Sequence, residues 1–143
     1  MARYACMKKK LPAKDLELVR RVATKLRADM LQENDDDTLK AFCLDASRRL
    51  RDLLIKAGFK AWVVQGTFEI DNPDWSCGNE ELTEAQAHHP LHYWVELLTS
   101  PRIVVDITSD QFNDEMEGDE CTAVVVEPRR DLPRYRALRL NWQ

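Results

Sequence analysis

The sequence predicts an α+β domain in which N-terminal helices pack on an antiparallel β-sheet, because two helical patterns come first and only β-type runs follow. Hydrophobic residues make up 44% and charged residues 32% of the 143 residues, which is typical of a soluble globular protein. A chain of this length commonly forms one hydrophobic core. We therefore expect a single domain over residues 1–143.

The two predicted helices occupy residues 13–31 and about 38–57. In the first, apolar residues such as Leu16, Val19 and Met30 recur every three or four positions, which is the pattern of an amphipathic helix. Polar and acidic residues at 32–37 connect it to the second helix, whose N-terminus their carboxylates would stabilise. Gly58 follows the last apolar repeat and indicates the end of the second helix.

Four β-type runs come after the glycine, at residues 60–70, 92–98, 102–108 and 122–127. In the first run, Trp62, Val64 and Phe68 alternate with other positions, as in a strand. The polar segment 71–90 is long for a connection, and we expect a helical turn in it near residues 80–87. Only residues 99–101 separate the second run from the third, which predicts a hairpin.

The chain is locally basic from residue 128 onwards, although its formal net charge is −4. The charged residues of this segment are Arg129, Arg130, Asp131, Arg134, Arg136 and Arg139. We interpret the segment as solvated surface, with a docking strip for an acidic partner as the alternative. The negative overall charge argues against a nucleic-acid partner, which requires a basic face.

The sequence favours a cytoplasmic location without a membrane partner. The three lysines at 8–10 are followed by Leu11, Pro12 and further mixed residues, where a secretory signal needs an uninterrupted apolar stretch. No apolar run reaches membrane-spanning length. We therefore expect Cys6, Cys43, Cys77 and Cys121 to be free thiols. No particular oligomeric state is predicted.

Three residues could form a thiol-based catalytic site: Cys43, His92 and Asp106. Cys43 lies early in the second helix, where the helix dipole favours a thiolate if the cysteine is within the first turn; a helix start at residue 38 would place it deeper. In the hairpin, residues whose numbers sum to about 198–200 oppose each other, and His92 and Asp106 sum to 198. We expect the carboxylate to hold one imidazole nitrogen and leave the other for the thiol.

Each of the three residues has a structural interpretation when it is considered alone. Cys43 shares an apolar stripe with Ala46, Leu50 and Leu53, which is typical of a core cysteine. A single histidine or aspartate on a strand is usually structural as well. The combination of the three, and not any one of them, favours a catalytic site.

The residues around these three positions resemble transglutaminase-like proteins, a branch of the papain-like cysteine enzymes. The resemblance covers roughly residues 38–112 and rests on FCLDASRRLRDLLIKAGFKAWVVQG at 42–66, HYWVEL at 92–97 and IVVDITSDQF at 103–112. Family members have a cysteine at a helix start, a small-apolar-Gly segment, a His-x-Trp-x-Glu strand and a strand ending in apolar-Asp-x-Thr. The form of the last motif is similar to that of small bacterial and phage-borne members with a Cys-His-Asp triad.

The resemblance implies a papain-like or transglutaminase-like core and a role for each residue. Cys43 would be the nucleophile, His92 the general base and later the general acid, and Asp106 the orienting carboxylate. The family often has a small residue before the cysteine, whereas this chain has Phe42. Phe42 would either restrict the acyl pocket or mark a diverged site.

Further candidates for substrate binding or for an oxyanion hole are Gln65, Trp75, Trp94 and Gln111. The two glutamine amides could donate to an oxyanion, and Trp75 in the polar 71–90 loop could line a substrate groove. Trp94 matches the strand motif together with Glu96.

A zinc site is an alternative for the histidines, built from His88, His89 and His92 with Cys77 or Cys121. The spacing is poor, because the proline after His89 biases that residue away from a helix. We therefore expect no metal and no cofactor.

The predicted function is a cysteine-dependent acyl hydrolase or transferase that acts on amide bonds of a protein or peptide, of the peptidase or protein deamidase type. A thioester on Cys43 would be the intermediate. One alternative is a catalytically silent binding module that holds a protein partner through the basic C-terminal strip or the 71–90 loop. Another is an acyl- or acetyltransferase that uses the same triad.

Overall fold

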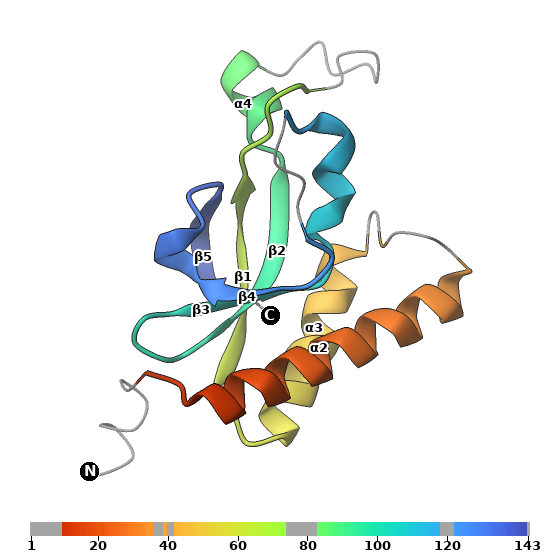
Figure 1. Ribbon diagram of the computed structural model, residues 1–143. Coiled ribbons are helices and arrows are strands. Elements are labelled where there is room, and N and C mark those ends of the chain that lie inside the picture. The colour runs from red at the N-terminus through yellow and green to blue at the C-terminus, as the bar shows by residue number, and fades with distance from the viewer. Residues whose placement is uncertain (1–9, 36–38, 40–41, 74–82, 118–121, 143) are drawn as a thin grey trace.

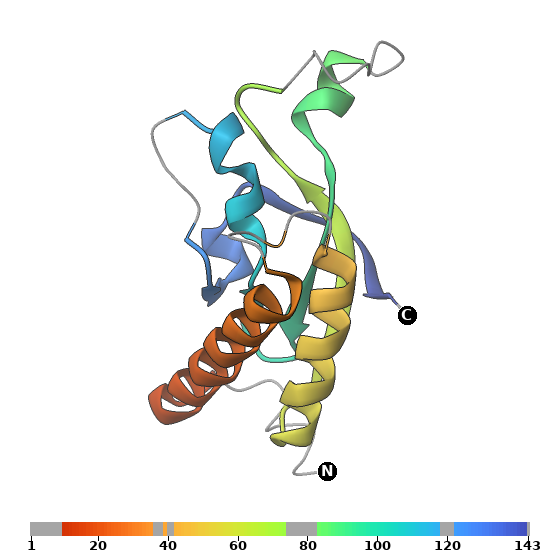
Figure 2. The same cartoon turned by 90° about the vertical axis from the view of Figure 1, so that its right-hand side faces the viewer.

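The computed structural model describes residues 10–35, 39, 42–73, 83–117 and 122–142. Its centre is a five-stranded sheet in the order β4-β3-β2-β1-β5, and every pair of neighbouring strands is antiparallel. The strands are β1 Ala61–Phe68, β2 Leu91–Leu97, β3 Ile103–Asp106, β4 Val125–Pro128 and β5 Tyr135–Trp142. Two long helices, α2 Ala13–Asn34 and α3 Cys43–Lys56, lie beside each other against the sheet (Figures 1 and 2). The prediction of an α+β fold is confirmed.

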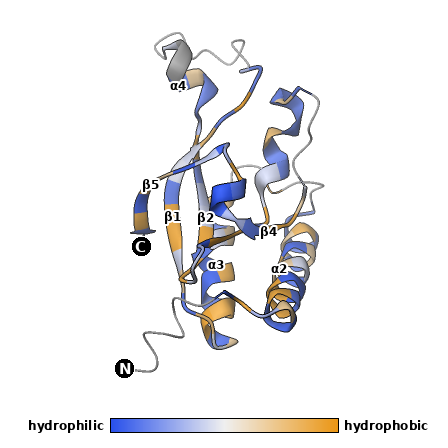
Figure 3. Cartoon of the chain, turned by 60° about the vertical axis from the view of Figure 1, so that its left-hand side comes forward, coloured by the Kyte–Doolittle hydropathy of each residue, from blue (hydrophilic) through white to orange (hydrophobic). Residues whose placement is uncertain are grey.

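One hydrophobic core lies between the two helices and the sheet. The apolar stripe of α2, which includes Val19, Ala23 and Met30, packs with α3 side chains and with the sheet residues Val95 and Val105. Hydrophobic positions in Figure 3 recur along α2, α3 and the central strands. Burial of such side chains contributes about 1.5–3 kcal/mol each, which explains why the helices stay on this face.

A second core covers the opposite face of the sheet. Trp94, Phe68 and Val104 point to this side because successive strand residues alternate between faces, and they pack with Phe112 and Tyr135. Phe112 belongs to η2, a 3-10 helix over Ser109–Glu115 that directly follows β3. His92 and Asp106 therefore lie next to a packed aromatic layer.

The helices match the prediction with two changes in their boundaries. α2 ends at Asn34, where Asp35 adopts a left-handed conformation, and not at residue 31. α3 begins at Cys43, so the prediction of a start near residue 38 was wrong. Phe42 is not helical and its carbonyl accepts the first helical bond from Ala46 at 2.8 Å. Burial of Leu39 and partial burial of Phe42 against the core outweigh the polar capping pattern before them.

The hairpin forms, but its register differs by one pair from the predicted His92–Asp106 opposition. Val95 pairs with Val105 and Leu97 with Ile103, so opposed residue numbers sum to 200. Continuing this register places Trp94 opposite Asp106, with His92 diagonal to it. A shift of two positions leaves a side chain on the same face, so both residues still lie on the aromatic side of the sheet.

The basic C-terminal segment is a strand and not only solvated surface. β5 pairs with β1, with Gly66 opposite Ala137 and Phe68 opposite Tyr135. The arginines hid the strand pattern because an edge strand exposes one side to solvent. The run predicted at 122–127 is likewise shifted, since β4 spans Val125–Pro128.

The expected helical turn in the 71–90 segment is α4, Glu84–His88. Thr83 caps it through a reciprocal pair of hydrogen bonds with Gln86. Among the helices in the described part of the chain, none is both long and apolar enough to cross a membrane.

Candidate active site

His92 and Asp106 form a buried hydrogen-bonded pair. Nε2 of His92 lies 2.7 Å from Oδ2 of Asp106, and the two residues are 0% and 2% exposed. The contact reaches diagonally across β2 and β3, which the length of the imidazole permits. Because the partner is a carboxylate, Nε2 carries the proton and Nδ1 faces the rest of the site.

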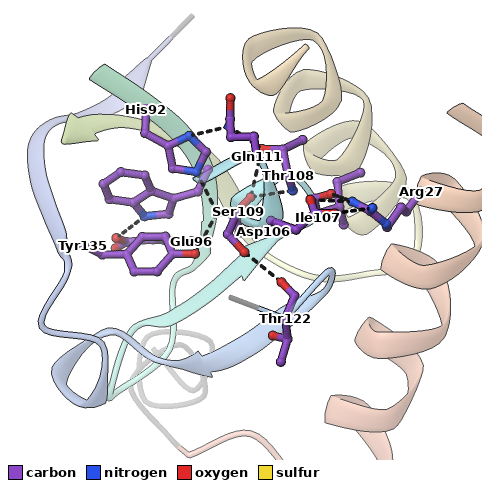
Figure 4. A network of polar contacts seen from close by, with 12 residues as sticks. Arg27, His92, Glu96, Asp106, Ile107, Thr108, Ser109, Gln111, Thr122 and Tyr135 are labelled. Carbon is purple, nitrogen blue, oxygen red and sulfur yellow. Dashed lines mark hydrogen bonds and ion pairs between the residues drawn. The ribbon is translucent and has the colours of Figure 1, made fainter. Parts of the chain in front are cut away.

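The carboxylate of Asp106 is saturated by donors (Figure 4). Oδ2 also accepts from the Tyr135 hydroxyl at 2.7 Å, while Oδ1 accepts from the Thr108 amide at 2.9 Å and from its hydroxyl at 3.2 Å. Burial alone would raise the pKa of Asp106, but the charge of His92 and these hydrogen bonds lower it below the ordinary value. Asp106 is therefore held as a carboxylate.

The Cys43 thiol interacts with the same imidazole. Burial lowers the pKa of His92. The charge and hydrogen bond of Asp106 raise it, as do, to a smaller extent, the hydrogen bond and charge of Cys43. The raising contributions outweigh burial, and the pKa of His92 is about 9. The imidazolium is consequently the stable form at neutral pH.

Cys43 is the first residue of α3 and is a half-buried free thiol. The amide N–H groups in the first turn of a helix have no carbonyl partner within the helix. The positive end of the helix dipole therefore lies at the residue that carries the thiol. The question that the sequence left open, whether the cysteine lies in the first turn, is answered by the position of Phe42 outside the helix.

Aromatic rings enclose His92. Ring centroids of Phe112, Trp94 and Phe68 lie 5.1, 5.8 and 6.0 Å from that of the imidazole. The Tyr135 ring follows at 6.2 Å. This layer excludes water from the imidazole and strengthens its interaction with Asp106.

Gln111 is the oxyanion candidate that lies at the site. Its Nε2 is 3.3 Å from Nδ1 of His92 and 3.5 Å from the Thr108 hydroxyl. The side chain thus approaches the imidazole nitrogen that is not bound by Asp106. The Gln111 N–H donates to Nδ1 only in the neutral imidazole, because the imidazolium carries a proton on both nitrogens.

The other candidates lie elsewhere. Gln65 donates to the Tyr93 hydroxyl at 3.0 Å, and this cross-strand pair lies on the sheet face opposite His92. Trp94 is fully buried and donates its indole N–H to Glu96 at 2.9 Å, so it is a packing residue beside His92 rather than a contact for substrate. Phe42 is half-buried directly before Cys43. Trp75 lies outside the described residues.

The zinc alternative gains no support from His88, because its Nδ1 lies 2.9 Å from the Ile70 carbonyl oxygen. The described residues contain no group of three or more potential metal ligands. Cys77 and Cys121, the cysteines of that alternative, lie outside the described residues.

Sequence reasoning missed two residues that shape the site. Tyr135 comes from the missed strand β5, and only recognition of that strand could have placed it near Asp106. Arg27, 8% exposed on α2, makes a bidentate pair with Asp110 at 2.7 and 3.1 Å and also donates to the Ile107 carbonyl. This clamp fixes the start of η2 and with it Gln111.

Comparison with known proteins identifies no relative: the sequence matches no family model and no curated protein, and the fold matches no solved structure.

Proposed function

We propose that this chain is a cysteine-dependent acyl hydrolase or acyltransferase that acts on amide bonds of a protein or peptide, with Cys43 as the nucleophile. The observation that carries the proposal is the buried pair of His92 and Asp106, whose Nε2 and Oδ2 atoms lie 2.7 Å apart, beside a helix that begins at Cys43. Cys43 is also one of the groups that raise the pKa of the same imidazole. A nucleophile, a base and an orienting acceptor in this order are the parts that thiol-based acyl transfer requires.

The proposed reaction begins with a Cys43 thiolate and a His92 imidazolium. The sulfur attacks the carbonyl carbon, and the imidazolium proton passes to the leaving amine as the C–N bond breaks. Water then attacks the thioester while neutral His92 takes its proton, which releases a carboxylic acid and restores the thiolate–imidazolium pair. Asp106 stays ionised throughout and orients the ring.

The backbone amide at the start of α3 and the Gln111 side chain are the proposed donors for the oxyanion. Both lie next to the thiol–imidazole contact. We further propose a transglutaminase-like version of the papain-like core, supported by the order of cysteine helix, sheet strand and His–Asp hairpin. Hydrolysis of a peptide bond and deamidation of a side-chain amide follow the same steps and differ in the amine released.

A thioester trap tests the proposal. p-Nitrophenyl acetate should acetylate Cys43, which intact-mass measurement and peptide mapping detect as one acetyl group on that thiol. Cys43→Ser should not form the thioester, and His92→Ala should slow both acylation and its hydrolysis by about 100-fold or more. Cys77→Ser serves as the matched control and should behave as the wild type.

A binding module without turnover is the competing function. The observation that favours it is the half-buried Phe42 beside the thiol. Phe42→Ala distinguishes the two: faster acetylation of Cys43 in this variant supports an acyl pocket narrowed by the ring. Absence of acetylation in both the wild type and Phe42→Ala would favour binding alone.

A further inference from the structure

Three arginines from two separate parts of the chain line one cavity. Arg102 precedes β3, whereas Arg129 and Arg130 follow β4 in the short η3 helix Arg129–Asp131. The arginine pocket, as we call it, has a volume of about 390 Å³ and is also lined by Leu132, Pro133 and Tyr135. The backbone joins the two parts, because the Arg129 amide donates to the Arg102 carbonyl at 2.9 Å.

Two of the three guanidinium groups are held in place by neighbours. Arg102 lies over the ring of Trp62, 5.2 Å from its centroid. Nε of Arg129 lies 3.1 Å from Oε2 of Glu96, whose side chain is fully buried. Arginines that are already positioned lose little conformational freedom when they bind a ligand.

The Arg129–Glu96 pair leaves hydrogen-bonding capacity unused. Neither Arg129 Nε nor Glu96 Oε1 has a hydrogen-bond partner among the described residues, although both atoms are buried. Among the described residues, the three arginines make a single ion pair with a carboxylate, which is the pair of Arg129 and Glu96. The arginine pocket therefore keeps an excess of positive charge, while Arg134 of the same basic segment is paired with Asp71.

We propose that the arginine pocket binds an anionic group, a phosphate or a carboxylate, at a site separate from Cys43. Guanidinium groups match both anions through paired N–H donors. Leu132 and Pro133 supply apolar contact for the part of the ligand that carries the charge. Tyr135 is a wall of the pocket and donates to Asp106, so the anion site and the Cys43 site share one side chain.

The test is a titration of the full chain with inorganic phosphate and, separately, with succinate, at constant ionic strength set by sodium chloride. Binding is followed by the indole fluorescence of the chain and by NMR signals of the arginine Nε–H groups. Saturable binding of phosphate alone identifies a phosphate site, and binding of both probes extends the site to carboxylates. Either result supports the proposal if the affinity depends on Arg102 and Arg130.

Arg102→Gln and Arg130→Gln should each weaken binding by about tenfold, since each removes a charge-assisted contact. Arg130 is exposed, so its replacement should leave the fold intact even if changes at Arg102 disturb Trp62. The matched control is Arg136→Gln, which removes the same charge from exposed β5 outside the pocket and should bind as the wild type. Absence of saturable binding, or an equal loss in Arg136→Gln, would overturn the proposal.

Discussion

The Tyr135 hydroxyl donates to Oδ2 of Asp106 at 2.7 Å, the same oxygen that Nε2 of His92 approaches at 2.7 Å. Tyr135 lies on β5 and Asp106 on β3 of the same sheet, so the hydrogen bond reaches from one strand to the other along the aromatic face. The carboxylate of Asp106 is thereby held by a residue of β5 in addition to His92 of the hairpin. Tyr135 is a positioning residue in the proposed mechanism, because it acts on the imidazole through Asp106.

Tyr135→Phe should retain the ring packing and lose the hydrogen bond to Asp106. We expect the free energy of unfolding to fall by about 1.5–3 kcal/mol, the usual contribution of a buried hydrogen bond to a charged group. Urea denaturation measures the change. Tyr93→Phe, which removes the hydroxyl that accepts from Gln65, is the control and should cost less because no charge is involved. Equal losses in the two variants would contradict a special role for Tyr135.

The raised pKa of His92 predicts a dependence of stability on pH. Protonation of His92 is favoured in the folded state, so its stabilising contribution is complete below the ordinary pKa of 6.5 and is lost as pH rises through about 9. The free energy of unfolding should therefore decrease between these pH values. Measurement in a Cys43→Ala background removes the titration of the thiol, and Asp106 still raises the His92 pKa there.

Asp106→Asn in the same background should abolish most of that slope. The substitution removes the negative charge that raises the pKa of His92, so the folded state no longer favours the imidazolium. NMR titration of the imidazole reports the pKa directly. An unchanged slope and an unchanged His92 pKa in Asp106→Asn would show that the carboxylate does not control the imidazole.

Loss of the Arg27 clamp should be costly. Arg27→Met leaves Asp110, 14% exposed at its side chain, without its bidentate partner, and breaking such a pair costs about 3–5 kcal/mol. Lys25→Met is a matched control on the same helix, since the Lys25–Asp29 pair is largely exposed and should cost less than about 0.5 kcal/mol. Chemical denaturation compares the two, and similar losses would contradict the clamp.

Gly66→Ala should destabilise the sheet around Trp94. A Cβ atom at position 66 would collide with the Trp94 ring and with the Arg136 carbonyl oxygen on the neighbouring strand. Overpacking typically lowers the free energy of unfolding by about 1–3 kcal/mol. Because the Arg136 carbonyl belongs to the backbone and cannot move aside as a side chain can, we expect a loss of about 3 kcal/mol or more. Gly58→Ala provides the contrast: its space is open and only its positive φ of 102° is strained. Thermal unfolding should rank Gly66→Ala as the more damaging.

The existence of the two long helices, the first strand and the hairpin could be predicted from the sequence, because the periodicity of their apolar residues reflects burial on one face. The sequence was misleading at the start of α3, where the acidic residues before it form a plausible cap and only tertiary burial of Leu39 and Phe42 places the start at Cys43. The observed hairpin register, with opposed residue numbers summing to 200, lies within the predicted range of 198–200. The direct opposition of His92 and Asp106 was wrong by one pair, since the connection length alone does not fix the register.

Strand β5 could not be predicted from its own residues, because arginines on an exposed edge look the same as a solvated tail. Its absence from the prediction also hid Tyr135 and the gathering of Arg102 with Arg129 and Arg130. Contacts of this kind depend on strand order, which a local pattern does not contain. The His92 and Asp106 pair, in contrast, was predictable because both residues belong to one hairpin.

The rate of Cys43 alkylation by iodoacetamide near pH 7 tests the central claim most directly. Peptide mass spectrometry gives the rate for Cys43, with Cys77 and Cys121 as internal references. We predict that Cys43 reacts at least about tenfold faster than the reference thiols, since a cation and a helix start favour its thiolate, and that His92→Ala removes the difference. Labelling of Cys43 at the rate of the other cysteines, unchanged by His92→Ala, would contradict an activated thiol.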